Sequence, residues 1–165
     1  MIIYLRRLAA FVGLVLLQVL ILNNIHIYGY GTPFFYIFFI LKYNSSVNRN
    51  ILMLWAFIFG ITIDIFSNTP GVNAAAATFL AFLRNPVLKS FTTSEDIGTF
   101  SPSIYTMGFS SFLKYIIVSV LIFCTILLSI DTFSFNEPYQ LLLRILSDSV
   151  ITVICILCID AIRRK

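Results

Sequence analysis

Two carboxylates, Asp64 and Asp148, lie inside apolar runs of the sequence and are the residues best placed to do chemistry. An ionisable group inside a membrane-spanning run is costly, so it is a functional candidate that can carry a proton, bind a ligand or act as an acid or base. Arg144 precedes Asp148 by four residues, so one helix would bring the two charges together. Two interpretations follow. Arg144 and Asp148 neutralise each other and fix their helix, or they form an intramembrane polar cluster with Gln18 that Asp64 and His26 join.

The sequence contains none of the familiar catalytic and metal-binding motifs considered below. A sole histidine, His26, excludes an HExxH zinc site, no P-loop occurs, and Gly108-Phe-Ser-Ser-Phe lacks the second glycine of a nucleophile elbow. Cys155 and Cys158 have helical spacing, but no further thiol and no nearby histidine completes a tetrahedral zinc set. We therefore expect a non-enzymatic protein with no catalytic residues, no metal and no cofactor.

Composition indicates that the elements positioning these residues lie in a lipid bilayer. Of 165 residues, 59% are hydrophobic and 11% charged, and the mean hydropathy is +0.97. Soluble domains carry about a quarter charged residues. The net charge of +4 comes from short basic clusters that orient membrane spans and do not resemble a nucleic-acid-binding patch.

Hydropathy predicts an all-α membrane protein with a single domain, residues 1–165, and six transmembrane helices. The spans expected are about residues 8–24, 33–43, 51–66, 70–84, 108–130 and 139–162, with a cytoplasmic loop at 85–107 in which Pro86 ends or kinks the fourth helix. The first span follows Arg6 and Arg7 and is expected to stay uncleaved. The second would rise only about 16 Å against a hydrocarbon core of about 30 Å, so it needs flanking residues or local thinning.

The basic residues provide a separate test of this topology. With both termini in the cytoplasm, ten of the eleven Lys and Arg residues lie on the inner side and only Arg144 lies toward the outside. This distribution follows the positive-inside rule and predicts a multi-pass protein of the bacterial inner membrane. Near the C-terminus, Asp160 is expected to pair locally with Arg163 and Arg164.

The stretch from Gly60 to Arg84 predicts a tight helical hairpin. Thr69 is expected to be the N-cap of the second helix, with Pro70 at its first position. Asp64, near the end of the first helix, opposes the helix dipole there and should accept N–H groups around residues 71–73. We favour this fastening role for Asp64 over a proton-carrying or ligand-binding one. Small residues let a neighbouring backbone approach closely in lipid. The candidate structural or partner-interface residues are Gly60, Asp64, Ser67, Pro70, Gly71, Ala74, Ala77, Thr78 and Ala81.

The hairpin residues also resemble those of a known family. Gly60 and Asp64 in Gly-xxx-Asp spacing, then Ser67, Gly71 and the alanines at 74–77, are similar to the third and fourth spans of the rod shape-determining protein MreD family. Gln18 in the first span and Pro33 at the start of the second, the chain length and the basic ends extend the resemblance over nearly the whole chain.

This resemblance implies a non-enzymatic scaffold of the bacterial cell-elongation machinery. Members of the family bind the single-span, largely periplasmic protein MreC and act with MreB filaments and peptidoglycan synthases in lateral wall growth and cell shape. The family fold is similar to the six-helix substrate-binding subunits of energy-coupling-factor transporters. The alternative function is therefore the substrate-binding membrane subunit of a vitamin-type transporter.

Overall fold

The computed structural model describes residues 13, 18, 33–92, 101–132 and 138–162. The described part is helical and contains no strand, and Gly13 and Gln18 are both helical. The helices are α2 (Ile37–Leu41), α3 (Arg49–Ser67), α4 (Val72–Ser90), α5 (Ile104–Met107), α6 (Phe109–Asp131) and α7 (Pro138–Ile162). Apart from those two residues, the expected first span lies outside the described residues.

Three of these helices, α3, α6 and α7, are long and apolar enough to cross a membrane. The predictions of an all-α chain and of membrane-spanning helices are therefore confirmed at this level. Helix α4 matches α3 in length at 19 residues, but it is richer in alanine and carries Arg84 and Lys89. The count of six spans and the cytoplasmic location of the termini stay predictions.

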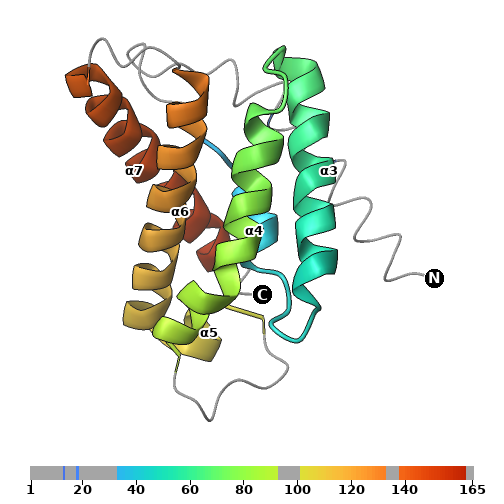
Figure 1. Cartoon of the computed structure of the whole chain (residues 1–165). Coiled ribbons are helices and arrows are strands. Elements are labelled where there is room, and N and C mark those ends of the chain that lie inside the picture. Colours follow the sequence, from blue (N-terminus) through green and yellow to red (C-terminus); the bar gives the residue numbers. More distant parts are fainter. Residues whose placement is uncertain (1–12, 14–17, 19–32, 93–100, 133–137, 163–165) are drawn as a thin grey trace.

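The helices pack as an antiparallel bundle around α4 (Figure 1). Helices α3 and α4 form the hairpin, α6 packs against α4, and α7 packs against α6. The short α2 contacts both α4 and α6, and α5 contacts α6. Consequently the start of α3, the end of α4 and the start of α6 lie at one end of the bundle.

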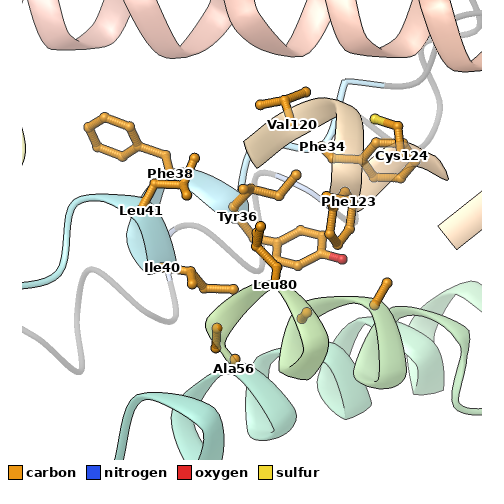
Figure 2. Packing of buried hydrophobic residues seen from close by; sticks show 14 of the residues in the cluster. Phe34, Tyr36, Phe38, Ile40, Leu41, Ala56, Leu80, Val120, Phe123 and Cys124 are labelled. Carbon is orange, nitrogen blue, oxygen red and sulfur yellow. The ribbon is translucent and has the colours of Figure 1, made fainter. Parts of the chain in front are cut away.

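The core is built on the residues around α2. Tyr36 and Ile37 are fully buried, and the ring of Tyr36 packs edge-on against Phe123 of α6, with 5.7 Å between ring centroids (Figure 2). The ring of Phe34 lies 5.5 Å from the same Phe123. Leu80 of α4 packs against the same group from another side. Aromatic side chains of the second apolar run thus fill the space between α4 and α6.

The second apolar run forms less helix than the sequence predicts. Instead of residues 33–43, only Ile37–Leu41 is α-helical, and residues 33–36 form an extended entry and a turn. Non-helical backbone at membrane depth is tolerated only where protein buries it and satisfies its hydrogen bonds. Residues 33–36 are buried, and side chains from other parts of the chain bond their backbone, as described below.

Two further helix boundaries differ from the prediction. Helix α4 begins at Val72 with Gly71 as N-cap, at a φ of 83°, so Thr69 and Pro70 belong to the turn. The carboxylate of Asp64 supplies the cap instead. At its other end α4 continues past Pro86 to Ser90, so Pro86 does not end the helix, and the end of the span near Arg84 stays a prediction. A proline removes one helical hydrogen bond, and the buried residues on both sides of it, Arg84 and Leu88, hold α4 against the core.

Candidate functional site

The carboxylate of Asp64 holds the α3–α4 hairpin together. Its Oδ1 accepts hydrogen bonds from the Asn73 backbone N at 3.0 Å, from Asn73 Nδ2 at 2.9 Å and from Thr69 Oγ1 at 2.9 Å, while Oδ2 accepts from the Ala74 backbone N at 2.9 Å. The two backbone donors are among the first N–H groups of α4, which have no partner within their own helix. The expectation that Asp64 binds N–H groups near residues 71–73 is confirmed at Asn73 and extends to Ala74.

Gly60 lets the two helices of the hairpin touch. A Cβ atom at this position would lie 2.3 Å from Ala74 Cα and 2.5 Å from Ala74 N, both backbone atoms of α4. Any larger residue must therefore push α3 and α4 apart. One turn later, Asp64 bonds the same stretch of α4, so the Gly-xxx-Asp spacing places the close contact and the cap on one face of α3.

The predicted small-residue set divides into an internal and an external group. Ala77 and Ala81 are fully buried in the core, and Ala74 is buried at the contact with Gly60. Gly71 and Pro70 are exposed, and Ser67 and Thr78 are partly exposed. Most of the alanine face thus serves packing within this chain, and only its edge faces outward.

That outer edge is the floor of an apolar groove between α3 and α4. The groove encloses about 730 Å³. Small residues of α4 line its floor, and large apolar side chains of both helices form its walls. The lining residues are Met53, Phe57, Ile61, Gly71, Ala74, Ala75, Thr78, Phe79 and Phe82.

A second polar group fastens the non-helical entry to α2. Gln18 is fully buried; its Nε2 donates to the Pro33 carbonyl at 3.0 Å and its Oε1 accepts from the Phe35 backbone N at 2.8 Å. Thr152 Oγ1 of α7 accepts from the Phe34 backbone N at 3.1 Å. This confirms that Gln18 faces other parts of the protein. Sequence reasoning missed Thr152, because a threonine in an apolar helix usually bonds its own helix.

Tyr36 connects this entry to the hairpin. Its hydroxyl donates to Asn73 Oδ1 at 3.0 Å, and Asn73 in turn donates to Asp64. Both side chains are buried. Asn73 was missed by sequence reasoning, although an asparagine two residues into an alanine-rich helix is a signal that a polar partner is near.

The carbonyl end of α2 is held by a buried arginine. Arg84 is 1% exposed, and its Nε and Nη2 both lie 3.4 Å from the Leu41 carbonyl; Nη2 also donates to the carbonyl of Tyr43. The Tyr115 hydroxyl of α6 donates to the same Leu41 carbonyl at 3.2 Å. From the sequence, Arg84 was expected only to end the hairpin and to be one of the ten basic residues on the inner side. In the structure it supplies donors to carbonyls that a five-residue helix cannot satisfy internally.

Arg144 and Asp148 do not form the ion pair that their spacing predicts. Arg144 Nη1 lies 4.0 Å from Asp131 Oδ2 at the end of α6, and both side chains are partly exposed. Asp148 is fully buried, on the side of α7 that faces Cys124 of α6. Arg144 thus links two helix ends, whereas Gln18 bonds the entry to α2. Two of the three residues of the predicted polar cluster, Gln18 and Arg144, therefore serve different parts of the fold.

Asp160 also has a partner that the sequence did not indicate. It forms an ion pair with Lys42, just after α2, and its Oδ2 accepts from the Ile104 backbone N at 3.2 Å. One carboxylate near the end of α7 thus connects α2 and α5. The expected partners Arg163 and Arg164 lie outside the described residues, as does His26.

The described residues contain no group of three or more His, Cys, Asp or Glu side chains that could hold a metal ion. Cys155 is half-buried and Cys158 exposed, and both are free thiols. No family model, curated protein or solved structure matches the chain. The geometry of these polar groups therefore carries the functional argument.

Proposed function

We propose that this protein is a non-enzymatic scaffold of the bacterial cell-elongation complex, located in the inner membrane, where it binds an MreC-like single-span partner. One observation carries the proposal: two residues of the pattern that resembles MreD, Gly60 and Asp64, both contact a third, Ala74. Gly60 and Asp64 meet Asn73 and Ala74 at the same contact, so the motif builds a rigid hairpin. A motif that stabilises a helical hairpin, and does not form a reactive site, suits a scaffold protein that holds partner proteins in place.

The internal hydrogen bonds also argue against a catalytic role. Asp64 accepts four hydrogen bonds, and Gln18 and Thr152 are bonded to the entry of α2. General acid–base catalysis needs a group within hydrogen-bond reach of a substrate proton. Side chains that are buried and bonded to the fold do not offer that reach without rearrangement.

Charge at the helix ends is in line with the proposed orientation. Arg49 at the start of α3, Lys89 in the last turn of α4 and Lys114 in the second turn of α6 lie toward one end of the bundle, and Arg144 lies toward the other. Basic residues gather on the cytoplasmic side of membrane proteins. This supports placing the Arg49 end in the cytoplasm and directing the α3–α4 turn outward.

A partner helix needs a long apolar surface, and α7 offers one. Its exposed large apolar residues recur every three or four positions: Tyr139, Leu142, Leu146, Val150 and Ile154. From Tyr139 to Ile154 the helix rises about 22 Å. Among the described helices, α7 packs against α6, and this face of α7 is exposed to lipid or to a second helix (Figure 1).

Photo-crosslinking in native bacterial membranes tests the proposal. A crosslinking amino acid at Leu146 of α7 should capture a single-span, largely periplasmic protein. The same amino acid at Leu54, on the outer face of α3, is the matched control and should capture far less of it. If neither site nor a pull-down after general crosslinking recovers such a protein, the scaffold proposal is wrong.

One observation favours the alternative, a transporter subunit. The buried hydroxyl of Ser119 has no hydrogen-bond partner among the described residues, and that of Ser149, next to the buried Asp148, has only the Cys124 thiol beside it. Unsatisfied buried hydroxyls suit a site for a small polar molecule. This function predicts a small molecule retained through purification together with co-purifying ATPases. A preparation free of both would eliminate it.

A further inference from the structure

The structure assigns a second binding site, independent of the scaffold proposal: we propose that the α3–α4 groove holds an acyl chain of an anionic phospholipid whose phosphate binds Arg49. The argument requires only that α3 lies in a bilayer, for which it is long and apolar enough. It rests on the shape of the groove, its lining and the charge at one end.

The groove has the chemistry of a lipid tail site. Its floor is Ala75 and neighbouring small residues, and its walls include Phe57 and Phe79, which are 45% and 48% exposed. From Gly71 to Phe82 the floor runs about 16 Å along α4, close to half the thickness of a hydrocarbon core. An acyl chain lying along it would cover aromatic surface and fill a space that side chains leave open.

The charge at one end selects the headgroup. The Arg49 guanidinium lies over the ring of Phe82, with 4.5 Å from Cζ to the ring centroid, and Phe82 is the groove residue nearest the C-terminal end of α4. Arg49 is the first residue of α3, one turn before the groove residue Met53. The cation therefore stands at the boundary level from which a lipid chain would enter the groove.

Arg49 is also available to a phosphate. It is exposed, and neither of the two ion pairs among the described residues involves it. The first turn of α3 has no acidic residue, and its N-cap Asn48 makes no side-chain hydrogen bond to the helix. Guanidinium groups bind phosphate oxygens in a bidentate geometry, and basic pockets between helices at the membrane surface bind anionic headgroups.

A phospholipid fits these features better than a partner helix does. A helix in the groove would displace the exposed aromatic walls or stand on them, because close helix packing in lipid uses small residues on both sides. A flexible chain passes between Phe57 and Phe79 without that requirement. The proposal therefore commits to lipid, and a helix in the groove is an outcome that would overturn it.

Native mass spectrometry of the detergent-purified full chain tests the headgroup. With equal amounts of phosphatidylglycerol and phosphatidylcholine, the wild-type protein should retain the anionic lipid about fivefold more, the effect expected of one basic residue near a membrane surface. Arg49→Gln should lose this preference. The control Lys89→Gln removes an exposed charge from the same end of the bundle and should keep it. Retained preference in Arg49→Gln, or equal loss in Lys89→Gln, would overturn the assignment.

Lipid photo-crosslinking, on the unaltered chain and on one groove variant, tests the groove. Phosphatidylglycerol carrying a photoreactive group in its acyl chain should crosslink to Phe57, Phe79 or Ala75. Labelling spread evenly over the exposed apolar faces of α3 and α7, or a protein helix crosslinked at Ala75 in native membranes, would contradict the proposal. Ala75→Trp, which fills the groove floor, should reduce this labelling at least severalfold.

Discussion

Replacement of Asp64 tests most directly whether the buried carboxylate near the end of the apolar helix α3 has a structural role. In Asp64→Asn, the side-chain oxygen can keep the three hydrogen bonds now made to Oδ1. The amide nitrogen then faces the Ala74 backbone N–H, so a donor meets a donor. A buried donor left without a partner costs about 1–3 kcal/mol, and this range is the expected loss in the free energy of unfolding.

Asp64→Ala removes both oxygens. The backbone N–H groups of Asn73 and Ala74 then both lose their acceptor, which at the same cost per group predicts a loss of roughly 2–6 kcal/mol. The Thr69 hydroxyl lies in the turn before α4 and can replace part of the cap, so we expect the lower half of that range. The order of stability should be wild type, Asp64→Asn, Asp64→Ala.

The measurement is equilibrium unfolding in mixed micelles at increasing SDS, followed by the fluorescence of Trp55, the single tryptophan of the chain. Trp55 is on α3, within the hairpin that Asp64 fastens. The matched control is Asp131→Asn. The Asp131 carboxylate lies 4.0 Å from Arg144, and both side chains are about one-third exposed, so the loss should stay within about 1 kcal/mol.

The refuting result is specific. If Asp64→Asn unfolds like wild type and yet abolishes capture of the partner, the carboxylate has a chemical role and the fastening argument is wrong. If it unfolds like the Asp131→Asn control and keeps partner capture, the four hydrogen bonds contribute little and the hairpin is held by packing alone.

Three further substitutions test the other contacts by the same unfolding measurement. Gly60→Ala puts a Cβ into the backbone of α4 and should lower the free energy of unfolding by about 1–3 kcal/mol or more. The control Gly13→Ala, where a Cβ would have nothing within 4 Å, should be neutral or slightly stabilising. Equal effects would refute the close contact between α3 and α4. Thr152→Val leaves the buried backbone N–H of Phe34 unpaired and should cost about 1–3 kcal/mol of stability. The control Thr125→Val changes an exposed threonine bonded to its own helix and should cost almost nothing. A neutral Thr152→Val would show that the bond from Phe34 to α7 does not stabilise the fold. Arg84→Met removes the donor to the Tyr43 carbonyl and leaves the Leu41 carbonyl with the Tyr115 hydroxyl alone, so it should destabilise by a similar amount, about 1–3 kcal/mol. A neutral result would mean that other groups satisfy the Tyr43 carbonyl.

Periodicity and hydropathy predicted the long helices well, because their buried faces extend over many turns. The start of α3 was placed within two residues and the start of α6 within one. Asp64 is a carboxylate next to a turn that a helix follows. This placement also indicated its hydrogen-bond donors, the N–H groups at the start of that helix. Those interactions are local in sequence, nine or ten residues apart, so one chain can show them.

The interactions that sequence reasoning missed join distant parts of the chain. Lys42 pairs with Asp160 across 118 positions, and Phe34 bonds Thr152 across the same separation. No spacing rule connects such residues. A predicted pair four residues apart, Arg144 and Asp148, failed for a related reason: the end of α6 offered Arg144 another carboxylate.

The second apolar run explains why these long-range bonds exist. Residues 33–43 are too few to cross a bilayer as a helix, and only five of them are helical. Every backbone group left outside the helix must be bonded by protein, because lipid offers no donor or acceptor. Gln18 and Thr152 do this before α2, and Arg84 and Tyr115 do it after α2. A polar residue inside an apolar helix therefore has two physical explanations. It belongs to a functional site, or it hydrogen-bonds backbone groups that a nearby short helix leaves unpaired. In this chain the short second run predicts that such hydrogen bonds are needed, and four buried polar side chains from other parts of the chain supply them.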